Sequence, residues 1–380
     1  MDDASVATIA EHFSDLDDPR NSNRRHLLFD IIVLAICATI CGADSWADVE
    51  LFGQSKYKWF RQFLELPHGI PSHDTFGRVF ALLDAEQFQA CFTEWVSAIS
   101  EVFQGQIVAV DGKTLRRSRD KAAGKQAIQI VSAWAAQNRL VLGQMKVNEQ
   151  SNEITAIPEL LAMLEITGCI VTTDAIGCQK AIAQAIVDQD ADYVLAVKEN
   201  QDHLYETFQD LFQYPAEMVA AGCDYHKTVE KGHGRIEVRE CWTTSDPDYL
   251  RYISEQLSEW PGLRSLVMVK SERTIIGEAS TLKYRYFISS LDSDARLGLH
   301  AVRTHWEIEN KVHWILDIAF REDDCRVRKG NGAENLAVLR HIALNLLKHE
   351  KSRKGSIKGK RKMAGWDNDY LLKVLTSQMR

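Results

Sequence analysis

The most constraining feature of the chain is a change of hydrophobic period after Gly105. Three short apolar runs follow in quick succession and predict adjacent strands: QIVAVDG, AIQIVSAWAA and LVLGQMKVN. Helix, strand, helix and strand are predicted next: ITAIPELLAMLE, CIVTTDA, QKAIAQAIVDQ and DYVLAVKEN. Neighbouring strands followed by alternating helices and strands predict an α/β fold, with a mixed sheet covered by helices.

The residues before this segment, 27–100, have helical spacing. The apolar run LLFDIIVLAICATI is shorter than the roughly 20 residues of a membrane span and contains Asp30, so we expect a buried helix. Ser72 predicts the N-cap of a helix in HDTFGRVFALL. We therefore predict an N-terminal helical domain over residues 1–104, which either binds DNA or serves in assembly by packing on the next domain.

A further change of pattern covers residues 202–285. One predicted helix, QDHLYETFQDLFQ, precedes three strand-like runs: HGRIEVRECWTTS, LRSLVMVKSERTI and LKYRYFISSL. They predict a β-rich insertion, at about 202–285, in a core that spans residues 105–347. Helices return from His300 onward, and residues 348–380 form a separate basic C-terminal segment.

The composition narrows the class of protein. With 380 residues and 45% hydrophobic content, the chain can form two or three domains with their own cores. The net charge of -8 argues mildly against a general polyanion binder, although it hides local basic stripes. None of the eight cysteines forms a CxxC pair, and the N-terminus lacks an apolar signal core, so we expect a reduced, cytoplasmic protein without a zinc ribbon.

Three carboxylates stand where they can act together. Asp111 and Asp174 end predicted strands, and Glu309 lies on a predicted helix with Asn310 and His313 close by. An aspartate after a strand is usually a turn or cap residue, so neither is informative alone. Together they predict a site for Mg²⁺, which prefers carboxylate oxygens and which in pairs can activate both oxygens of a phosphodiester exchange.

Basic residues accompany these carboxylates. Asp111 is followed by Lys113, Arg116 and Arg117, a cluster suited to a phosphate backbone, and Lys198 follows the strand DYVLAV. His233, Arg235 and Arg239 lie on a predicted strand of the insertion, either as DNA contacts or as an ordinary exposed strand face.

Two other features have a structural and a functional interpretation. Trp306 and Trp314 are expected to be core anchors, with base stacking as the alternative. The basic stretch KHEKSRKGSIKGKRK, residues 348–362, is typical of a flexible segment that binds nucleic acid, with a solvated loop as the alternative.

Separated strings along nearly the whole chain resemble the H-repeat-associated transposases of bacteria, an insertion-sequence group with an Asp-Asp-Glu triad. They are FSDLDDPR, GIPSHDTFGRV, VDGKTLRRS, SNEITAIPELL, TTDAIGCQKAIA, DYVLAVKENQ, HGRIEVR and HWEIENKVHWILDIAFREDDCRVRKGN. The resemblance implies an RNase H-like core with a β-rich insertion before the last carboxylate. It also implies a transposase that cleaves DNA at element ends and transfers the strands, using Mg²⁺, with Mn²⁺ as a substitute.

Carried onto this chain, the triad is Asp111, Asp174 and Glu309, the last through the WxIEN pattern that begins at Trp306. A Tyr-x2-Arg-x3-Glu-x6-Lys pattern found around the last acid in related elements is incomplete here, whether counted from Glu309 or from Glu307. The expected partners are double-stranded DNA at the element ends and the target, with a homodimer on the DNA. An inactive transposase relic that only binds DNA and a stand-alone metal-dependent nuclease remain alternatives.

Overall fold

A computed structural model provides the three-dimensional structure of the chain. It describes residues 9–376 except 10, 23, 101–102, 120–123, 149–151, 216–221, 233, 258, 276 and 278.

The N-terminal region is helical, as the spacing predicted. Its helices are α2 (Leu28–Ile40), α3 (Trp46–Ser55), α4 (Tyr57–Phe60), α5 (His73–Leu82) and α6 (Ala85–Ile99). Helix α2 is buried from Asp30 to Ile40, and the backbone N–H of Leu66 donates to the Asp30 carboxylate, which confirms a buried helix. No helix among the described residues is long and apolar enough to cross a membrane. Ser72 caps α5 by accepting from the backbone N–H of Thr75.

One nine-stranded sheet runs through the molecule. In chain order its strands are β1 (Ile107–Leu115), β2 (Ile128–Ala135), β3 (Leu140–Lys146), β4 (Ile170–Thr173), β5 (Asp192–Val197), β6 (Asp224–Gly232), β7 (Arg235–Thr244), β8 (Ser265–Ile275) and β9 (Thr281–Ser289). In space the order is β3-β2-β1-β4-β5-β9-β8-β7-β6. Strands β1, β4 and β5 are parallel, and all other neighbours are antiparallel. The first five strands in this order, β3-β2-β1-β4-β5, form the mixed sheet of an RNase H-like core, as expected.

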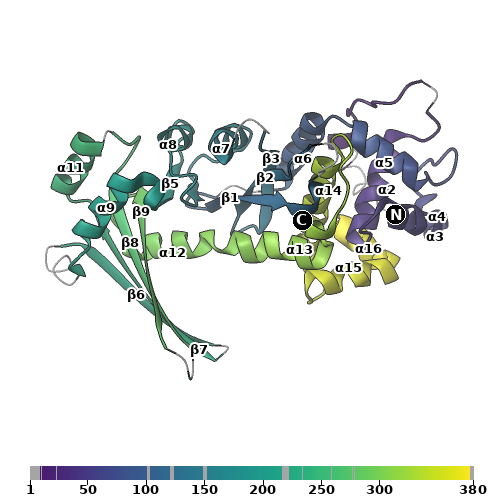
Figure 1. Cartoon of the computed structure of the whole chain (residues 1–380). Helices are drawn as coiled ribbons and strands as arrows, with labels where there is room; N and C mark the ends of the chain where they lie inside the picture. Colours follow the sequence, from purple (N-terminus) through teal and green to yellow (C-terminus); the bar gives the residue numbers. More distant parts are fainter. Residues whose placement is uncertain are drawn as a thin grey trace.

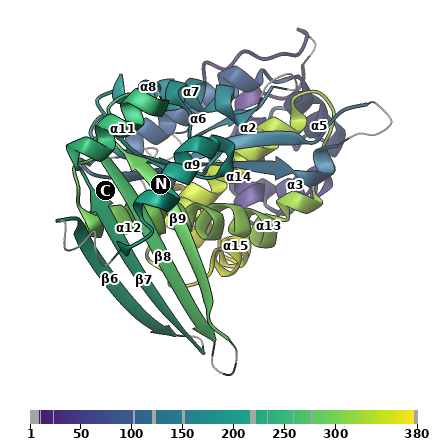
Figure 2. The same ribbon diagram turned by 60° about the vertical axis from the view of Figure 1, so that its left-hand side comes forward.

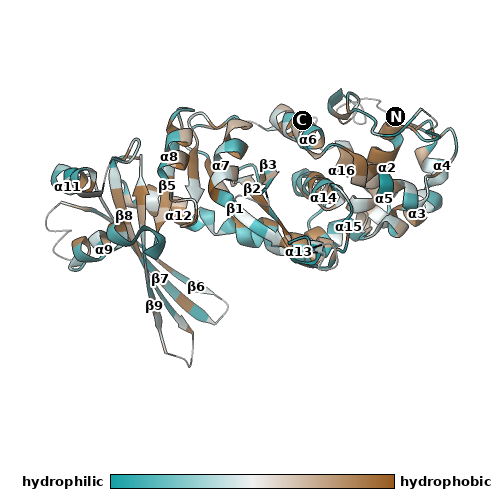
Figure 3. Ribbon diagram, turned by 45° about the horizontal axis from the view of Figure 1, so that its top comes forward, coloured by the Kyte–Doolittle hydropathy of each residue, from teal (hydrophilic) through white to brown (hydrophobic). Residues whose placement is uncertain are grey.

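Helices cover both faces of this core. On one face lie α6, α7 (Glu153–Ala162) and α8 (Lys180–Val187), and α12 (Ala295–His305) crosses the other face beneath β1 and β4 (Figure 1). Apolar side chains of α12, including Leu299 and Val302, form a buried cluster with Ile107 and Ile170 of the sheet. Figure 3 shows the apolar residues concentrated in the central strands and in α2, between polar outer helix faces. The strands that carry the first two aspartates are thus held on both sides.

The strands β6–β9 form a long arm that projects from the core (Figure 2). Strand β9 joins the core sheet by pairing Val194–Val197 of β5 with Tyr286–Ser289. Residues are buried where β7, β8 and β9 leave the core and become exposed toward the tip of the arm. Helices α9 (Asp202–Leu211) and α11 (Pro247–Leu257) lie at its base. Strand β6 and helix α11 were not predicted from the sequence.

The C-terminal third is helical. After α12 come a π-helical turn η3 (Glu309–His313), then α13 (Trp314–Phe320), a short 3-10 turn η4 (Glu322–Asp324), α14 (Gly332–His349), α15 (Ile357–Trp366) and α16 (Asn368–Thr376). All eight cysteines are free thiols, in line with the expected reduced protein.

The expectation of a flexible basic segment at 348–362 is wrong for its second half. Lys360 and Arg361 of α15 are buried, at 7% and 5% exposure. The Lys360 ammonium donates to the carbonyl oxygens of Leu347 and Glu350, and the Arg361 guanidinium donates to those of Thr39 and Ala319. Lys360 therefore caps the end of α14, and Arg361 joins α2 to α13, so neither cation faces solvent.

Candidate metal centre and its flanking surfaces

Asp111 and Asp174 lie next to each other on two central strands that run parallel. Asp174 directly follows β4, but Asp111 lies within β1, which continues to Leu115, so the prediction that Asp111 ends a strand is wrong. The parallel pairing of β1 with β4 ends at Val110 opposite Thr173, so the following residue on each strand is an aspartate. Neighbouring strands are about 4.8 Å apart, which brings the two residues together although 63 positions separate them in the chain. The Asp174 carboxylate also accepts from the backbone N–H of Ile176 at 3.0 Å, which fixes the turn into α8.

Glu309 approaches Asp111 from the face of the sheet that α12 covers. It begins the π-helical turn η3, in which the N–H of Trp314 donates to the Glu309 carbonyl oxygen five residues earlier. Wide turns of this kind often occur at functional sites. Four positions later, His313 lies on the same side of the helix, and its Nε2 is 3.2 Å from Oδ2 of Asp111.

Asp111, Glu309 and His313 form a group with metal-binding geometry. Their ligand atoms all lie within 4.8 Å of one another, close to the roughly 4.2 Å between opposite ligands of an ion with bonds of about 2.1 Å. Carboxylate oxygens suit Mg²⁺ and Mn²⁺, and imidazole suits Mn²⁺ and the later transition metals. The donor set therefore fits a divalent cation. Glu307, the alternative third acid, lines a groove on the arm side and is not in this group.

Lys113 continues the contact between β1 and the helix that carries Glu309, His313 and Asp317. It is two residues beyond Asp111 on the same side of the strand, and Asp317 is four residues beyond His313. The Lys113 ammonium lies 2.5 Å from Asp317 and 2.7 Å from the buried carboxylate of Glu322. Burial opposes the charge of Lys113, but Glu322 and Asp317 outweigh it and raise its pKa. Lys113, which was predicted to contact DNA, is therefore paired with two carboxylates inside the protein.

Sequence analysis missed a fourth carboxylate, Glu153, at the start of α7. It lies against Gly112, where any Cβ would overlap its carboxylate, so only glycine admits it beside Asp111. Burial raises the pKa of Glu153, and the Asp174 and Asp111 carboxylates raise it further. The string SNEITAIPELL carried this residue, but nothing local distinguished it from an ordinary first-turn glutamate.

His305 is a second histidine that sequence analysis did not assign. Its Nδ1 is 3.1 Å from the Thr172 hydroxyl of β4. Burial lowers the pKa of His305, while the Asp111 and Asp174 carboxylates oppose that change. A neutral imidazole therefore supports the two strand ends from the α12 side.

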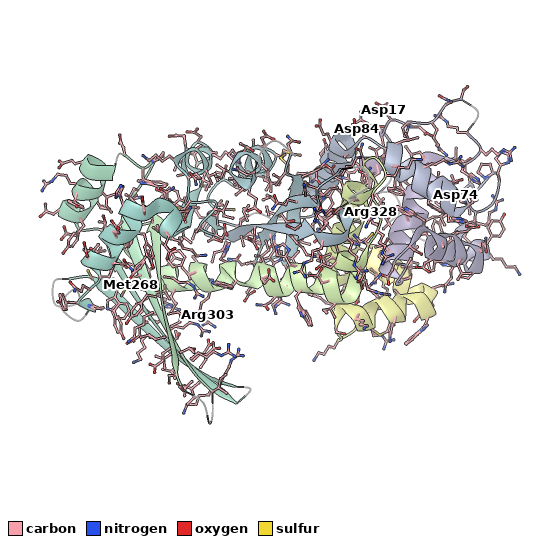
Figure 4. All side chains as sticks on the ribbon, in the orientation of Figure 1. Asp17, Asp74, Asp84, Met268, Arg303 and Arg328 are labelled. Carbon is pink, nitrogen blue, oxygen red and sulfur yellow. The ribbon has the colours of Figure 1, made fainter. Side chains whose placement is uncertain are left out.

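The arm and α12 enclose a groove of about 1170 Å³ that reaches Asn310, the neighbour of Glu309. Its lining holds seven Arg and Lys residues and four Asp and Glu residues. Arg235 and Arg239 both lie there, and both contact Glu237. Arg303 of α12, labelled in Figure 4, faces the same groove and pairs with Glu230 at 2.6 Å. His233 lies outside the described residues.

The other predicted DNA contacts are exposed. Arg116 and Arg117 follow β1 in a 3-10 turn (Arg116–Ser118, η1) and lie 3.3 and 3.5 Å from Asp323 and Asp324. Lys198 follows β5 at the surface. These side chains are free to exchange carboxylates for phosphates, because weak surface pairs are readily replaced.

The expectation that Trp306 and Trp314 are core anchors is wrong. Their exposures are 50% and 58%. The Arg285 guanidinium lies over the Trp306 ring, 4.8 Å from its centroid. Burial lowers the pKa of Arg285, and the neighbouring Arg239 lowers it further. The arm groove therefore ends in an exposed aromatic ring beside the metal centre.

Comparison with known proteins agrees with this architecture. A transposase DDE domain matches residues 102–346, and the DDE_Tnp_1-associated family matches residues 10–96. The "H repeat-associated putative transposase YhhI" of Escherichia coli K12 is 42% identical over 97% of both chains. The "Putative transposase YncI" of Escherichia coli O157:H7 is 40% identical over 98% of this chain and 95% of its own. A shorter relative, "Inactive transposase YbfQ" of strain K12, is 42% identical over 19% of this chain. The chain belongs to the DDE transposase family.

Proposed function

We propose that the protein cleaves DNA at the ends of a bacterial insertion sequence and transfers the freed strands to a target. The proposal rests on one observation above the others. Asp111, within the central strand β1, has Asp174 beside it just beyond the end of β4 and the Glu309–His313 pair across from it on a helix. Among the described residues the candidate metal group holds Asp111, Glu309 and His313 but not Asp174, and a second cation position between Asp111 and Asp174 is part of the proposal.

In the proposed assignment, Asp111 is shared between the two positions, Asp174 completes one, and Glu309 with His313 completes the other. Bound divalent cations would supply charge neutralisation on the phosphate and an activated oxygen nucleophile. The role of the chain is to hold these ligands rigidly. Strands β1 and β4 have neighbours on both edges. The partly buried His305 contacts β4 from the helix side, and the partly buried Lys113 of β1 pairs with Asp317 of α13.

The arm groove is the proposed DNA-binding surface nearest the centre. Arg235 and Arg239 contribute from β7, and Arg116, Arg117 and Lys198 contribute from turns at the ends of core strands. Phosphate contacts of this kind position the duplex without reading its sequence. Lys113 is not included, because its two carboxylate partners hold it inside the protein. A homodimer on paired DNA ends remains part of the proposal.

The test uses purified protein, Mg²⁺ or Mn²⁺, and a plasmid that carries the gene with its own flanking DNA. Cut ends are mapped by sequencing for the wild type and for Asp111→Asn. We expect breaks at defined flanking positions, joined products, and neither of these with the variant. Breaks at random positions without joining would indicate a stand-alone nuclease. DNA binding without any breaks would indicate an inactive relic.

A further inference from the structure

We infer that a second basic surface, formed where the N-terminal helices meet the core, binds the phosphate backbone of double-stranded DNA beyond the cleavage position. This inference rests on the proposed function and assigns it another binding site. The surface is a crevice of about 630 Å³ that combines α5, the β1–β2 connection and the loop 325–331. It is called here the junction crevice, and its charged lining residues are Asp74, Arg78, Lys125, Arg326, Arg328 and Lys329.

The charge of the junction crevice is its first distinguishing property. Five cationic side chains face one carboxylate, in a protein whose net charge is -8. Among the described residues, none of the five forms an ion pair. Arg78 and Arg328 only donate to carbonyl oxygens, those of Asp74 and Arg117. An exposed cluster of like charges without counterions attracts a polyanion, and repulsion within the cluster falls when phosphates bind.

The second property is that the loop is built rigidly. Asn331 donates from its backbone to the carbonyl oxygen of Ala81 and from its side chain to that of Leu83. Asn335 donates to the carbonyl oxygen of Phe80 at 2.9 Å. These bonds occupy the free carbonyl groups at the end of α5. Gly330 has a φ of +53° and approaches Ala81 so closely that a Cβ would overlap the Ala81 oxygen.

This rigidity matters for binding. A loop whose backbone is already fixed loses little conformational entropy when its side chains contact a ligand. Arg326, Arg328 and Lys329 are thus exposed on a preformed support. In the arm groove, Arg235, Arg239 and Arg303 are already paired with glutamates, although Arg273, Lys283 and Arg296 of its lining form no ion pair among the described residues.

The position of the junction crevice relates it to the metal centre. Arg328 donates to the carbonyl oxygen of Arg117, just beyond the end of the strand that carries Asp111. Leu115 is four positions beyond Asp111 along the strand, a span of about 13 Å. Figure 4 shows Arg328 toward the N-terminal helices and Arg303 toward the arm, with the helical segment η3–α13, which carries Glu309 and His313, between them. A duplex with one phosphate per strand every 3.4 Å would reach the crevice about four to six base pairs from the scissile phosphate.

The occupant is double-stranded DNA backbone and not a small anion. The five cations are spread over three chain segments around an open crevice, and no buried polar pocket for a single phosphate is present in the described part of the crevice. The apolar floor of Trp46 and Val327 also offers no hydrogen bond for recognising a particular ligand. The contacts should therefore be independent of base sequence.

The test compares two triple variants that remove the same charge. Arg326→Ala/Arg328→Ala/Lys329→Ala alters the junction crevice, and Arg251→Ala/Arg264→Ala/Lys373→Ala removes three exposed cations that lie outside the predicted DNA-binding surfaces. Affinity for a 30-base-pair duplex is measured by fluorescence anisotropy from 50 to 300 mM KCl, with EDTA present. We expect the crevice variant to bind about tenfold more weakly and its salt slope to fall by about two to three. The control should lose less than twofold.

Further arms separate the outcomes. Unchanged thermal unfolding of both variants excludes misfolding, and Arg328→Lys should retain the wild-type slope. Equal losses in both triple variants, or an unchanged slope in the crevice variant, would overturn the inference, even if wild-type protein binds and cuts DNA. Failure of the wild type to bind any duplex would instead refute the proposed function. Competition by inorganic phosphate at millimolar concentration would contradict a backbone site and indicate a single-anion site.

Discussion

Lys113 and Arg239 each contact two carboxylates, yet their surroundings are opposite. Lys113 and its partner Glu322 are 12% and 2% exposed behind the metal centre. Arg239 and its partner Glu230 are 20% and 47% exposed on the arm. A buried charge that loses its partner stays stranded in a medium of low polarity, whereas an exposed one is taken over by water or a phosphate.

The comparison shows how the same residue types serve two purposes. The buried charges hold in place the strand and the helix that carry the proposed metal ligands. Neither water nor a phosphate can replace their partners. The exposed charges form a network of ion pairs on the arm, and a phosphate can replace each glutamate of this network. We therefore expect changes behind the centre to alter activity and stability, and changes on the arm to alter DNA affinity alone.

The largest expected effect is that of Asp111→Asn. Loss of a shared ligand removes several kcal/mol of stabilisation from the transition state, so cleavage should fall by about 1000-fold or more. DNA affinity without metal should change less than about twofold. Initial rates on an element-end substrate and anisotropy with EDTA measure the two quantities. Asp188→Asn, at an exposed helix end, is the matched control and should leave both unchanged. If weaker DNA binding accounted for the loss of rate, the expected separation between activity and DNA affinity would be refuted.

Next in size is the effect of Glu322→Gln on stability. It leaves the buried Arg340 without its carboxylate partner and leaves Lys113 with Asp317 alone, so the free energy of unfolding should fall by about 3 kcal/mol. Urea unfolding followed by tryptophan fluorescence measures this loss. On the arm, Glu237→Gln should cost less than about 1 kcal/mol, because its partners remain hydrated. Equal losses for the two variants would remove the basis of the comparison.

The pH dependence of that stability follows from the same contact. Burial opposes ionisation of Glu322, but Lys113 and Arg340 outweigh it and lower its folded-state pKa. Its contribution should be complete above the unfolded pKa of about 4.3 and be lost as the pH falls through the lower folded value. Unfolding curves between pH 3 and pH 7 should therefore show a loss on the acid side that is absent in Glu322→Gln.

His313→Gln should have an intermediate effect. Removal of a nitrogen ligand should weaken Mn²⁺ binding by about 10- to 100-fold, while binding of DNA without metal is retained. Pulsed EPR of Mn²⁺-loaded protein should detect nitrogen coupling in the wild type and none in the variant. The same Mn²⁺ affinity without nitrogen coupling in either protein would mean that His313 only orients Asp111.

Arg239→Ala should have a smaller effect, confined to DNA binding. Loss of one phosphate contact should weaken binding a few-fold and reduce the salt slope by about one. Anisotropy across a salt series measures this change, and unfolding should be unaffected. Arg251→Ala, an exposed arginine on α11 that pairs with Asp248, is the control and should bind as the wild type does.

The smallest expected effect has the opposite sign. Glu237 holds both Arg235 and Arg239, so Glu237→Gln should free two cations and tighten DNA binding by about two- to fivefold. A titration in low salt is the most sensitive measurement, because screening weakens the gain as salt rises. Weaker binding by this variant would mean that Glu237 positions the arginines for DNA instead of competing with it.

Much of the fold was predictable because its signals are local. The strand residues that directly precede Asp111 and Asp174 are continuous buried runs, as central strands require. The buried helix α2 and the Ser72 cap follow from composition and spacing in the same way. Strand β6 was missed because DYHKTVEKG is exposed along nearly its whole length at the edge of the sheet and so has no apolar alternation.

The sequence by itself determined most of the order of elements, the family resemblance and the placing of Asp111 and Asp174 directly after apolar strand residues, since each depends on residues that are close in the chain. The tertiary structure alone decided which side chains meet. It joined His313 to Asp111, gave Lys113 a partner 209 residues away and fitted Glu153 against Gly112. It also turned Trp306 and Trp314 outward and buried Lys360 and Arg361. Such outcomes depend on packing between distant segments, and a local pattern carries no information about the partner that a folded chain will supply.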